Sequence, residues 1–182
     1  MPERDLKPYA LVLSCIFAAA FLAGAFAPPP ARQEVTRIFR FVDGTYRDLA
    51  GGTLFLLILA NNVIGSFLTL LFGLFLGIVP VMSVASNGLI LGVLCRQAGE
   101  TQGYAKAALA VLPHGIFEIP ALLIAASYGL RLGAAVLRLA RRKESTPIGP
   151  RLLHAVRRYF VVVFPLLVLA AAIETALLLA VS

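Results

Sequence analysis

Five long apolar runs determine what this chain can fold into, since each holds about 18 residues or more. A helix that rises about 1.5 Å per residue needs roughly 20 apolar residues to cross a hydrocarbon core of about 30 Å. Charged residues make up only 14% of the chain, against about 25% in soluble domains. The sequence therefore predicts an all-α polytopic membrane helical bundle, one domain over residues 1–182. The predicted spans are Tyr9–Ala27, Gly51–Phe72, Ile78–Cys95, Ala107–Gly129 and Phe160–Val181.

The first run imitates a secretory signal, because Arg4 and Lys7 precede it and small residues end it. The run is longer than a typical signal core, and Pro28–Pro30 lies where a signal peptidase would cut. We therefore expect this run to be retained as the first membrane helix.

The net charge of +7 does not indicate nucleic-acid binding, because the cations lie in short segments between the apolar runs, where they set topology. With the N-terminus in the cytoplasm, ten of the 16 cations fall on the inner side and six on the outer side. This bias predicts an integral protein of the cell membrane with a cytoplasmic N-terminus and an external C-terminus. Eight of the inner cations lie between Arg131 and Arg158, where they would attract anionic lipid of the bilayer or act simply as a stop-transfer signal.

Between the first two spans, apolar residues recur at helical spacing opposite arginines and acids. This pattern predicts an amphipathic helix that lies in the outer interface or caps the bundle. The apolar positions are Val35, Ile38, Phe39, Val42, Tyr46 and Leu49.

Three segments share the form Gly-Leu-x-Leu-Gly. Glycines four residues apart let helices approach closely in lipid. We expect such pairs on lipid-facing surfaces to support a homo-oligomer. The glycines are Gly73, Gly77, Gly88, Gly92, Gly129 and Gly133.

Polar side chains from four predicted helices fall at similar depths, in the middle and outer half of the membrane. His114 and Glu118 stand four apart and so share one helix face. Pro113, Gly115 and Pro120 predict a kink or interruption in that helix. Irregular backbone at membrane depth must face protein or a water-filled cavity, so we expect this stretch to face inward. The predicted polar layer contains Asn61, Asn62, Asn87, His114, Glu118 and Glu174.

Three interpretations of this polar layer remain open. Its groups can hold helices together through hydrogen bonds. They can instead line a path for ions, protons or lipid headgroups. A third interpretation is a metal-dependent intramembrane hydrolase, with a divalent metal bound by His114, Glu118 and Glu174. Spacing alone does not favour the metal, and no cofactor is otherwise predicted.

The stretches "PHGIFEIPA" and "YGLRLG", with "NN" in the second span and "NGLILG" in the third, resemble the stage II sporulation protein M family between about Gly51 and Gly133. The resemblance implies a multi-helix membrane protein without an established catalytic activity. In spore-forming bacteria the namesake works with two cell-wall hydrolases in a membrane complex, but related proteins occur in organisms that form no spores. The matching positions are Asn61, Asn62, Asn87, Gly88, Pro113, His114, Gly115 and Glu118.

Together these features predict a non-enzymatic membrane scaffold or assembly partner that contacts other membrane proteins. A transporter or channel is the alternative, and the metal-dependent hydrolase is the third hypothesis.

Overall fold

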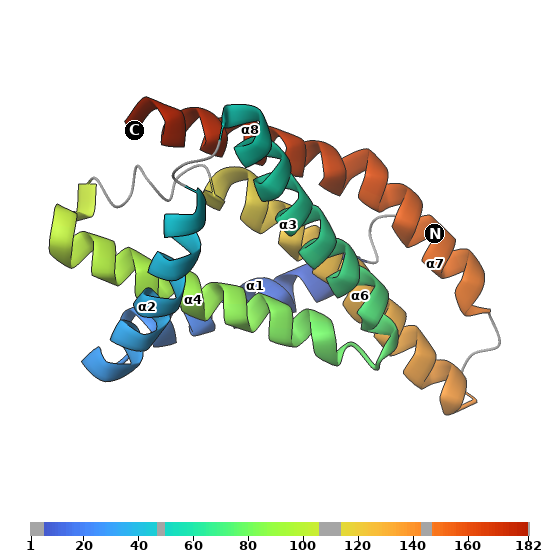
Figure 1. Cartoon of the computed structure of the whole chain (residues 1–182). Coiled ribbons are helices and arrows are strands. Elements are labelled where there is room, and N and C mark those ends of the chain that lie inside the picture. Colours follow the sequence, from blue (N-terminus) through green and yellow to red (C-terminus); the bar gives the residue numbers. More distant parts are fainter. Residues whose placement is uncertain (1–5, 47–49, 106–113, 143–146, 182) are drawn as a thin grey trace.

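The computed structural model describes residues 6–46, 50–105, 114–142 and 147–181, without the side chains of residues 38–46, 114 and 181. Across these ranges the chain is helical and contains no strand (Figure 1). Five stretches are long and apolar enough to cross a membrane, which confirms the predicted fold class. The elements are α1 (Lys7–Ala25), α2 (Pro29–Tyr46), α3 (Gly51–Leu71), η2 (Phe72–Leu74), α4 (Ile78–Gln102), η3 (His114–Glu118), α6 (Ile119–Ala140), α7 (Ile148–Arg158), η4 (Tyr159–Val163) and α8 (Phe164–Val181).

The helices extend beyond the apolar runs that predict them. α4 continues to Gln102, past Cys95, and α6 continues to Ala140, past Gly129. The last spanning stretch begins at Ile148 and joins α7, η4 and α8. Hydropathy detects only the apolar part of a helix, whereas backbone hydrogen bonds continue through its polar ends. Residues 107–113 of the predicted fourth span lie outside the described residues.

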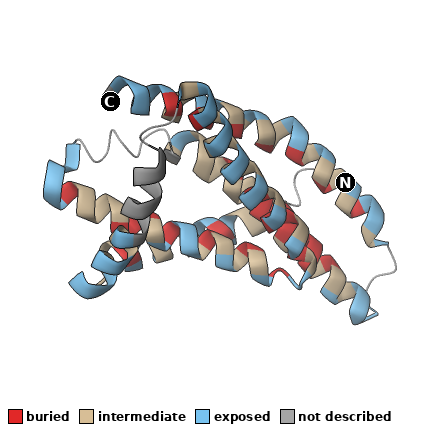
Figure 2. Ribbon diagram, in the orientation of Figure 1, coloured by how far each residue is buried: buried red, intermediate tan, exposed pale blue. Residues whose placement is uncertain are grey.

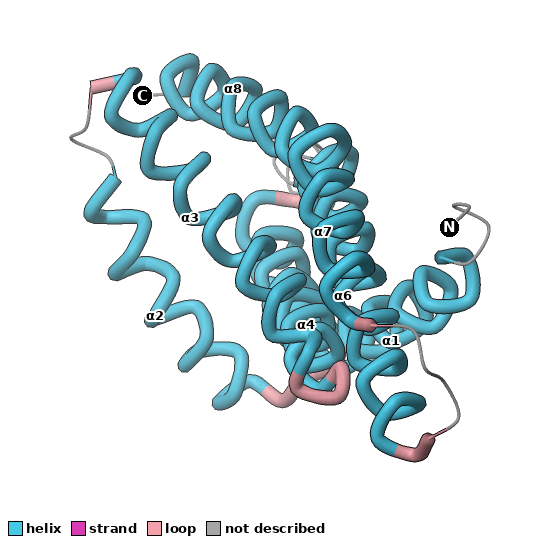
Figure 3. The backbone as a smooth tube through the Cα atoms, turned by 90° about the vertical axis from the view of Figure 1, so that its right-hand side faces the viewer, coloured by secondary structure: helices cyan, strands magenta, loops and turns pink. Residues whose placement is uncertain are grey.

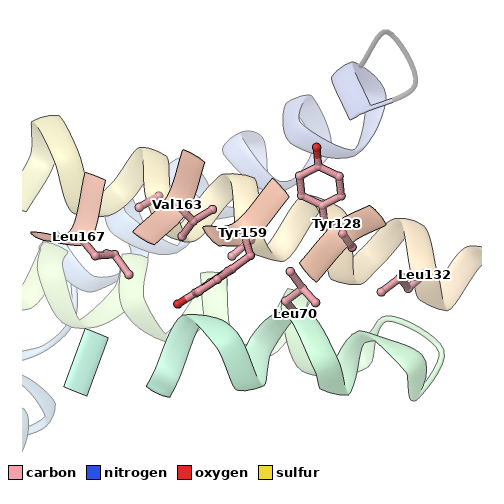
Figure 4. Packing of buried hydrophobic residues seen from close by; sticks show 9 residues of the cluster. Leu70, Tyr128, Leu132, Tyr159, Val163 and Leu167 are labelled. Atoms are coloured by element: carbon pink, nitrogen blue, oxygen red, sulfur yellow. The ribbon is translucent and has the colours of Figure 1, made fainter. Parts of the chain in front are cut away.

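α6 is the central helix of the molecule. Over its most apolar window 56% of the residues are buried, against 11% in α1, and α6 contacts α1, α3, α4, α7 and α8. Buried residues follow its length in Figure 2. In one core cluster, Leu70 of α3 and Tyr128 of α6 pack with Tyr159 and Leu167 of the last span (Figure 4). This cluster joins α3, α6 and the last span.

A second group is built from α1 and α4. A small core of Leu13, Val84 and Ala126 attaches this pair to α6. Gly88 and Gly92 of α4 are buried against backbone of α1, and a Cβ at Gly92 would overlap the carbonyl of Phe21. The absence of side chains at these two positions therefore lets α1 and α4 approach closely.

The two remaining Gly-Leu-x-Leu-Gly segments meet each other. A Cβ at Gly73 would overlap backbone of Gly129, and one at Gly133 would overlap backbone of Gly77. Gly77 also has a φ of 77° as it starts α4 after the turn, a left-handed conformation that favours glycine. This contact packs the η2 turn against α6.

The expectation that these six glycines lie on lipid-facing surfaces is wrong. All of them are buried within one protomer, because α1, α4, α6 and the η2 turn use them for contacts inside the fold. Association between protomers stays a prediction, but these glycines do not support it.

α2 lies at the edge of the molecule in both views (Figures 1 and 3) and packs against α4. Arg32 of α2 donates to Glu100 of α4 at 2.8 Å, and Arg96 donates to the other carboxylate oxygen of Glu100 at 2.6 Å. The predicted amphipathic segment is thus helical, although the side chains of residues 38–46 lie outside the described residues. This ion pair attaches α2 to the bundle.

Candidate functional site

A polar cavity of about 170 Å³ lies between α1, α3, α4, α8 and the junction of η3 with α6. Asn61 and Asn62 line it from α3, Asn87 from α4 and Glu118 from η3. Asn61 and Asn87 are exposed, whereas Asn62 and Glu118 are partly buried. The cavity is therefore open on one side. The rest of its lining consists of Phe17, Gly65, Ser66, Ser83, Ile119, Leu122 and Leu167.

The cavity lies near the middle of several spans. Phe17, Asn61 and Asn87 all stand well inside α1, α3 and α4, which are long and apolar enough to cross a membrane. The polar groups consequently occupy a depth at which lipid offers no hydrogen-bond partner. Room of this size accommodates several waters, each of which takes about 30 Å³ in the liquid, or one small solute.

The asparagine side chains are oriented by hydrogen bonds to their own helices. The Asn61 amide donates to Oδ1 of Asn62 at 3.4 Å, and the Asn87 amide donates to the Ser83 carbonyl at 2.9 Å. The side-chain oxygens of Asn61 and Asn87 accept no hydrogen bond from the described residues. These two carbonyl oxygens are therefore available to a ligand.

Glu118 reaches the cavity from the end of η3, a π-helical turn. Pro120 follows in the first turn of α6, where a missing N–H is tolerated. Such turns leave the regular hydrogen-bond ladder and often occur at functional sites. The predicted irregularity thus takes the form of a π turn, with Gly115 inside it. Pro113 lies outside the described residues.

Tyr159 begins a second π turn, η4, and lies next to Ser66, which lines the cavity. The Tyr159 hydroxyl lies 2.8 Å from Oγ of Ser66 and donates to the Val63 carbonyl at 2.9 Å. Its ring packs edge to face on Phe67, with the ring centroids 5.0 Å apart. The last span is therefore bonded to α3 directly beside a residue that lines the cavity.

Two members of the predicted polar layer are not placed in this cavity. Glu174 of α8 is partly buried and is not among the lining residues. The backbone of His114 begins η3, but its side chain lies outside the described residues. Within the described part of the chain, no three residues among His, Cys, Asp and Glu are grouped to hold a metal ion.

Two serines that the sequence did not predict as site residues line the cavity. Ser66 lies four residues after Asn62 and bonds to its carbonyl at 2.6 Å. Ser83 lies four residues before Asn87, and Thr69 of α3 donates to its hydroxyl at 2.9 Å. The i, i+4 spacing from each asparagine could have identified both serines. No sequence signal pointed to Tyr159, because it follows two arginines at the start of an apolar run.

Comparisons with known proteins relate this chain to one family. The model of the family described as stage II sporulation protein M matches residues 10–177, well beyond the stretch that carried the resemblance. An uncharacterized protein of Methanocaldococcus jannaschii is 32% identical over 118 residues, which cover 64% of this chain. The matched region covers 66% of that relative, just under two thirds of its length. No solved structure matches the chain.

Proposed function

The chain belongs to the stage II sporulation protein M family, and from this premise we propose that it is a non-enzymatic membrane protein that assembles with another membrane protein. The open side of the polar cavity is the proposed contact. Helices of the partner would cover this side within the bilayer.

One observation carries this proposal: Asn61 and Asn87 are exposed residues although they lie well inside apolar spans. Hydrocarbon cannot satisfy a polar group, so leaving one there is costly. Interhelical hydrogen bonds are a common way to satisfy asparagine in a membrane. A polar side chain of a partner helix would satisfy both amides.

The cavity itself favours a second candidate, which is transport of a small polar solute or ion. Polar and ionisable groups that face a cavity inside the membrane commonly mark a substrate or ion path. Glu118 is such a group, because it lines a cavity that residues of α1, α3, α4, α6 and α8 also line. In this case water, rather than a partner helix, would satisfy the asparagines.

Site-specific photo-crosslinking in native membranes tests the assembly proposal. A photoreactive residue at Ile64 samples the open side, because Ile64 is 58% exposed and lies three residues after Asn61. The same residue at Val161, which is 67% exposed on η4, is the matched control. We expect one discrete protein adduct from the photoreactive residue at Ile64 and none from the one at Val161. When the photoreactive residue is placed on the identified partner instead, it should crosslink to this chain at the same contact. Adducts to lipid alone at both positions would contradict assembly through this face.

Thiol labelling distinguishes the transport candidate. In a Cys15→Ala, Cys95→Ala background, Asn87→Cys should react with a membrane-impermeant thiol reagent if the cavity is continuous with water. Leu89→Cys, an exposed position of α4 that does not line the cavity, is the control. Labelling at position 87 alone would favour transport over assembly.

A further inference from the structure

We propose that the polar cavity binds one monovalent alkali cation, with Glu118 as its only negatively charged ligand. The cation would use the side-chain oxygens of Asn61 and Asn87, and the second N–H group of each amide would remain for a partner helix or for water.

The lining residues supply several side-chain oxygen acceptors. Asn61 and Asn87 direct amide hydrogens to Asn62 and to the Ser83 carbonyl, which leaves their side-chain oxygens as acceptors. Ser66 and Ser83 add two hydroxyl oxygens, and Glu118 adds a carboxylate. A set of carboxylate, amide and hydroxyl oxygens suits a hard cation.

The charge of the site selects a monovalent ion. Glu118 is the only acidic residue among the lining residues, and none of the others carries a charge. A single positive charge matches the formal charge of the lining residues, whereas a divalent ion would exceed it in a low-dielectric region. Glu118 already has a contact within the chain, but its two oxygens can accept several interactions and can serve that contact and an ion together.

Two π turns flank the site, which is an independent observation. η3 ends at Glu118, which lines the cavity, and η4 begins at Tyr159, which bonds to the cavity residue Ser66. A π turn shifts backbone carbonyls out of the regular i to i+4 pattern. π turns of this kind often occur at functional sites.

Thermal unfolding of the purified full-length protein tests the proposal. We compare NaCl and KCl with N-methylglucamine chloride at equal ionic strength, a salt whose bulky organic cation cannot be coordinated as a bare ion by the oxygens that line the cavity. The unfolding midpoint should rise saturably with one alkali cation and stay constant with N-methylglucamine, because an ion that binds only the folded state stabilises it. Equal midpoints in all three salts would overturn the proposal.

Two carboxylate variants locate the effect. Glu118→Gln keeps the shape of the side chain but removes its charge, so it should lose the cation-dependent rise. Glu174 also lies in an apolar span, but it does not line the cavity. The Glu174→Gln protein should therefore keep the cation-dependent rise of the unfolding midpoint. A Glu118→Gln protein that responds like the wild type would contradict the site.

Direct binding of radioactive sodium to the wild type keeps the proposal testable if Glu118→Gln does not fold. We expect saturation near one ion per chain, with competition by an unlabelled alkali cation and none by N-methylglucamine. Asn87→Leu, which removes one proposed ligand oxygen while keeping a similar volume, should weaken this binding at least several-fold. Absence of saturable binding to the wild type would exclude the site.

Discussion

Tyr159 shows how one hydroxyl group connects two spans beside the cavity. The side chain is fully buried, and its hydroxyl bonds to Ser66 and Val63 of α3. Tyr159→Phe keeps the ring packing but leaves these partners with fewer hydrogen bonds, which should cost about 1–3 kcal/mol of unfolding free energy. Tyr104→Phe, at a side chain that is 62% exposed, should cost almost nothing. Thermal unfolding in one detergent measures both, and equal midpoints for the two variants would contradict this role for Tyr159.

At the same scale, the sequence predicted the polar residues better than it predicted their arrangement. Asn61, Asn62, Asn87 and Glu118 stand out because polar groups are costly in apolar runs, and the structure places all four around one cavity. Depth along a helix does not specify which face a side chain occupies in the assembled bundle. For this reason Glu174 was grouped with them although it does not line the cavity.

At the scale of helices, Gly92 controls how closely α1 and α4 approach. Gly92→Ala would place a methyl group on the Phe21 carbonyl, and because backbone cannot move aside as a flexible side chain does, we expect a loss of about 1–3 kcal/mol. Gly52→Ala in α3 meets nothing within 4 Å and should be neutral or stabilising by up to about 1 kcal/mol. Unfolding midpoints of the two variants check this difference. A Gly92→Ala protein as stable as the wild type would show that the helices do not need this contact.

The pattern of glycines predicted close helix contacts but not which helices make them. Spacing of four residues is the same whether a glycine pair faces lipid, a second copy or a neighbouring helix. The pairing of Gly73 with Gly129 joins segments far apart in sequence, so it depends on tertiary structure. Likewise, prolines and Gly115 predicted an interruption, but they did not specify its form, which is a π turn at His114–Glu118.

For the whole molecule, composition and apolar runs were sufficient to predict the fold class, because only helices of adequate length satisfy their backbone within lipid. The arrangement into an α1–α4 pair and an α3–α8 group around α6 was not predictable. It depends on side-chain contacts such as those of Tyr128 and Leu70, which have no periodic sequence signal.

The sidedness of the molecule in the membrane is a prediction that the cation distribution supports. Two of the inner cations, Arg131 and Arg151, are each only 7% exposed and do not lie on the surface of the molecule. Without these two the cytoplasmic side still leads by eight cations to six. We expect the two ends to lie on opposite sides of the membrane, because five stretches of the described residues are long and apolar enough to cross it. Alkaline phosphatase fused after Ser182 should therefore be active outside the cytoplasm, and green fluorescent protein at that position should be dark. Fusions made after Arg142 should give the opposite result, and a fluorescent fusion after Ser182 would reverse the predicted topology.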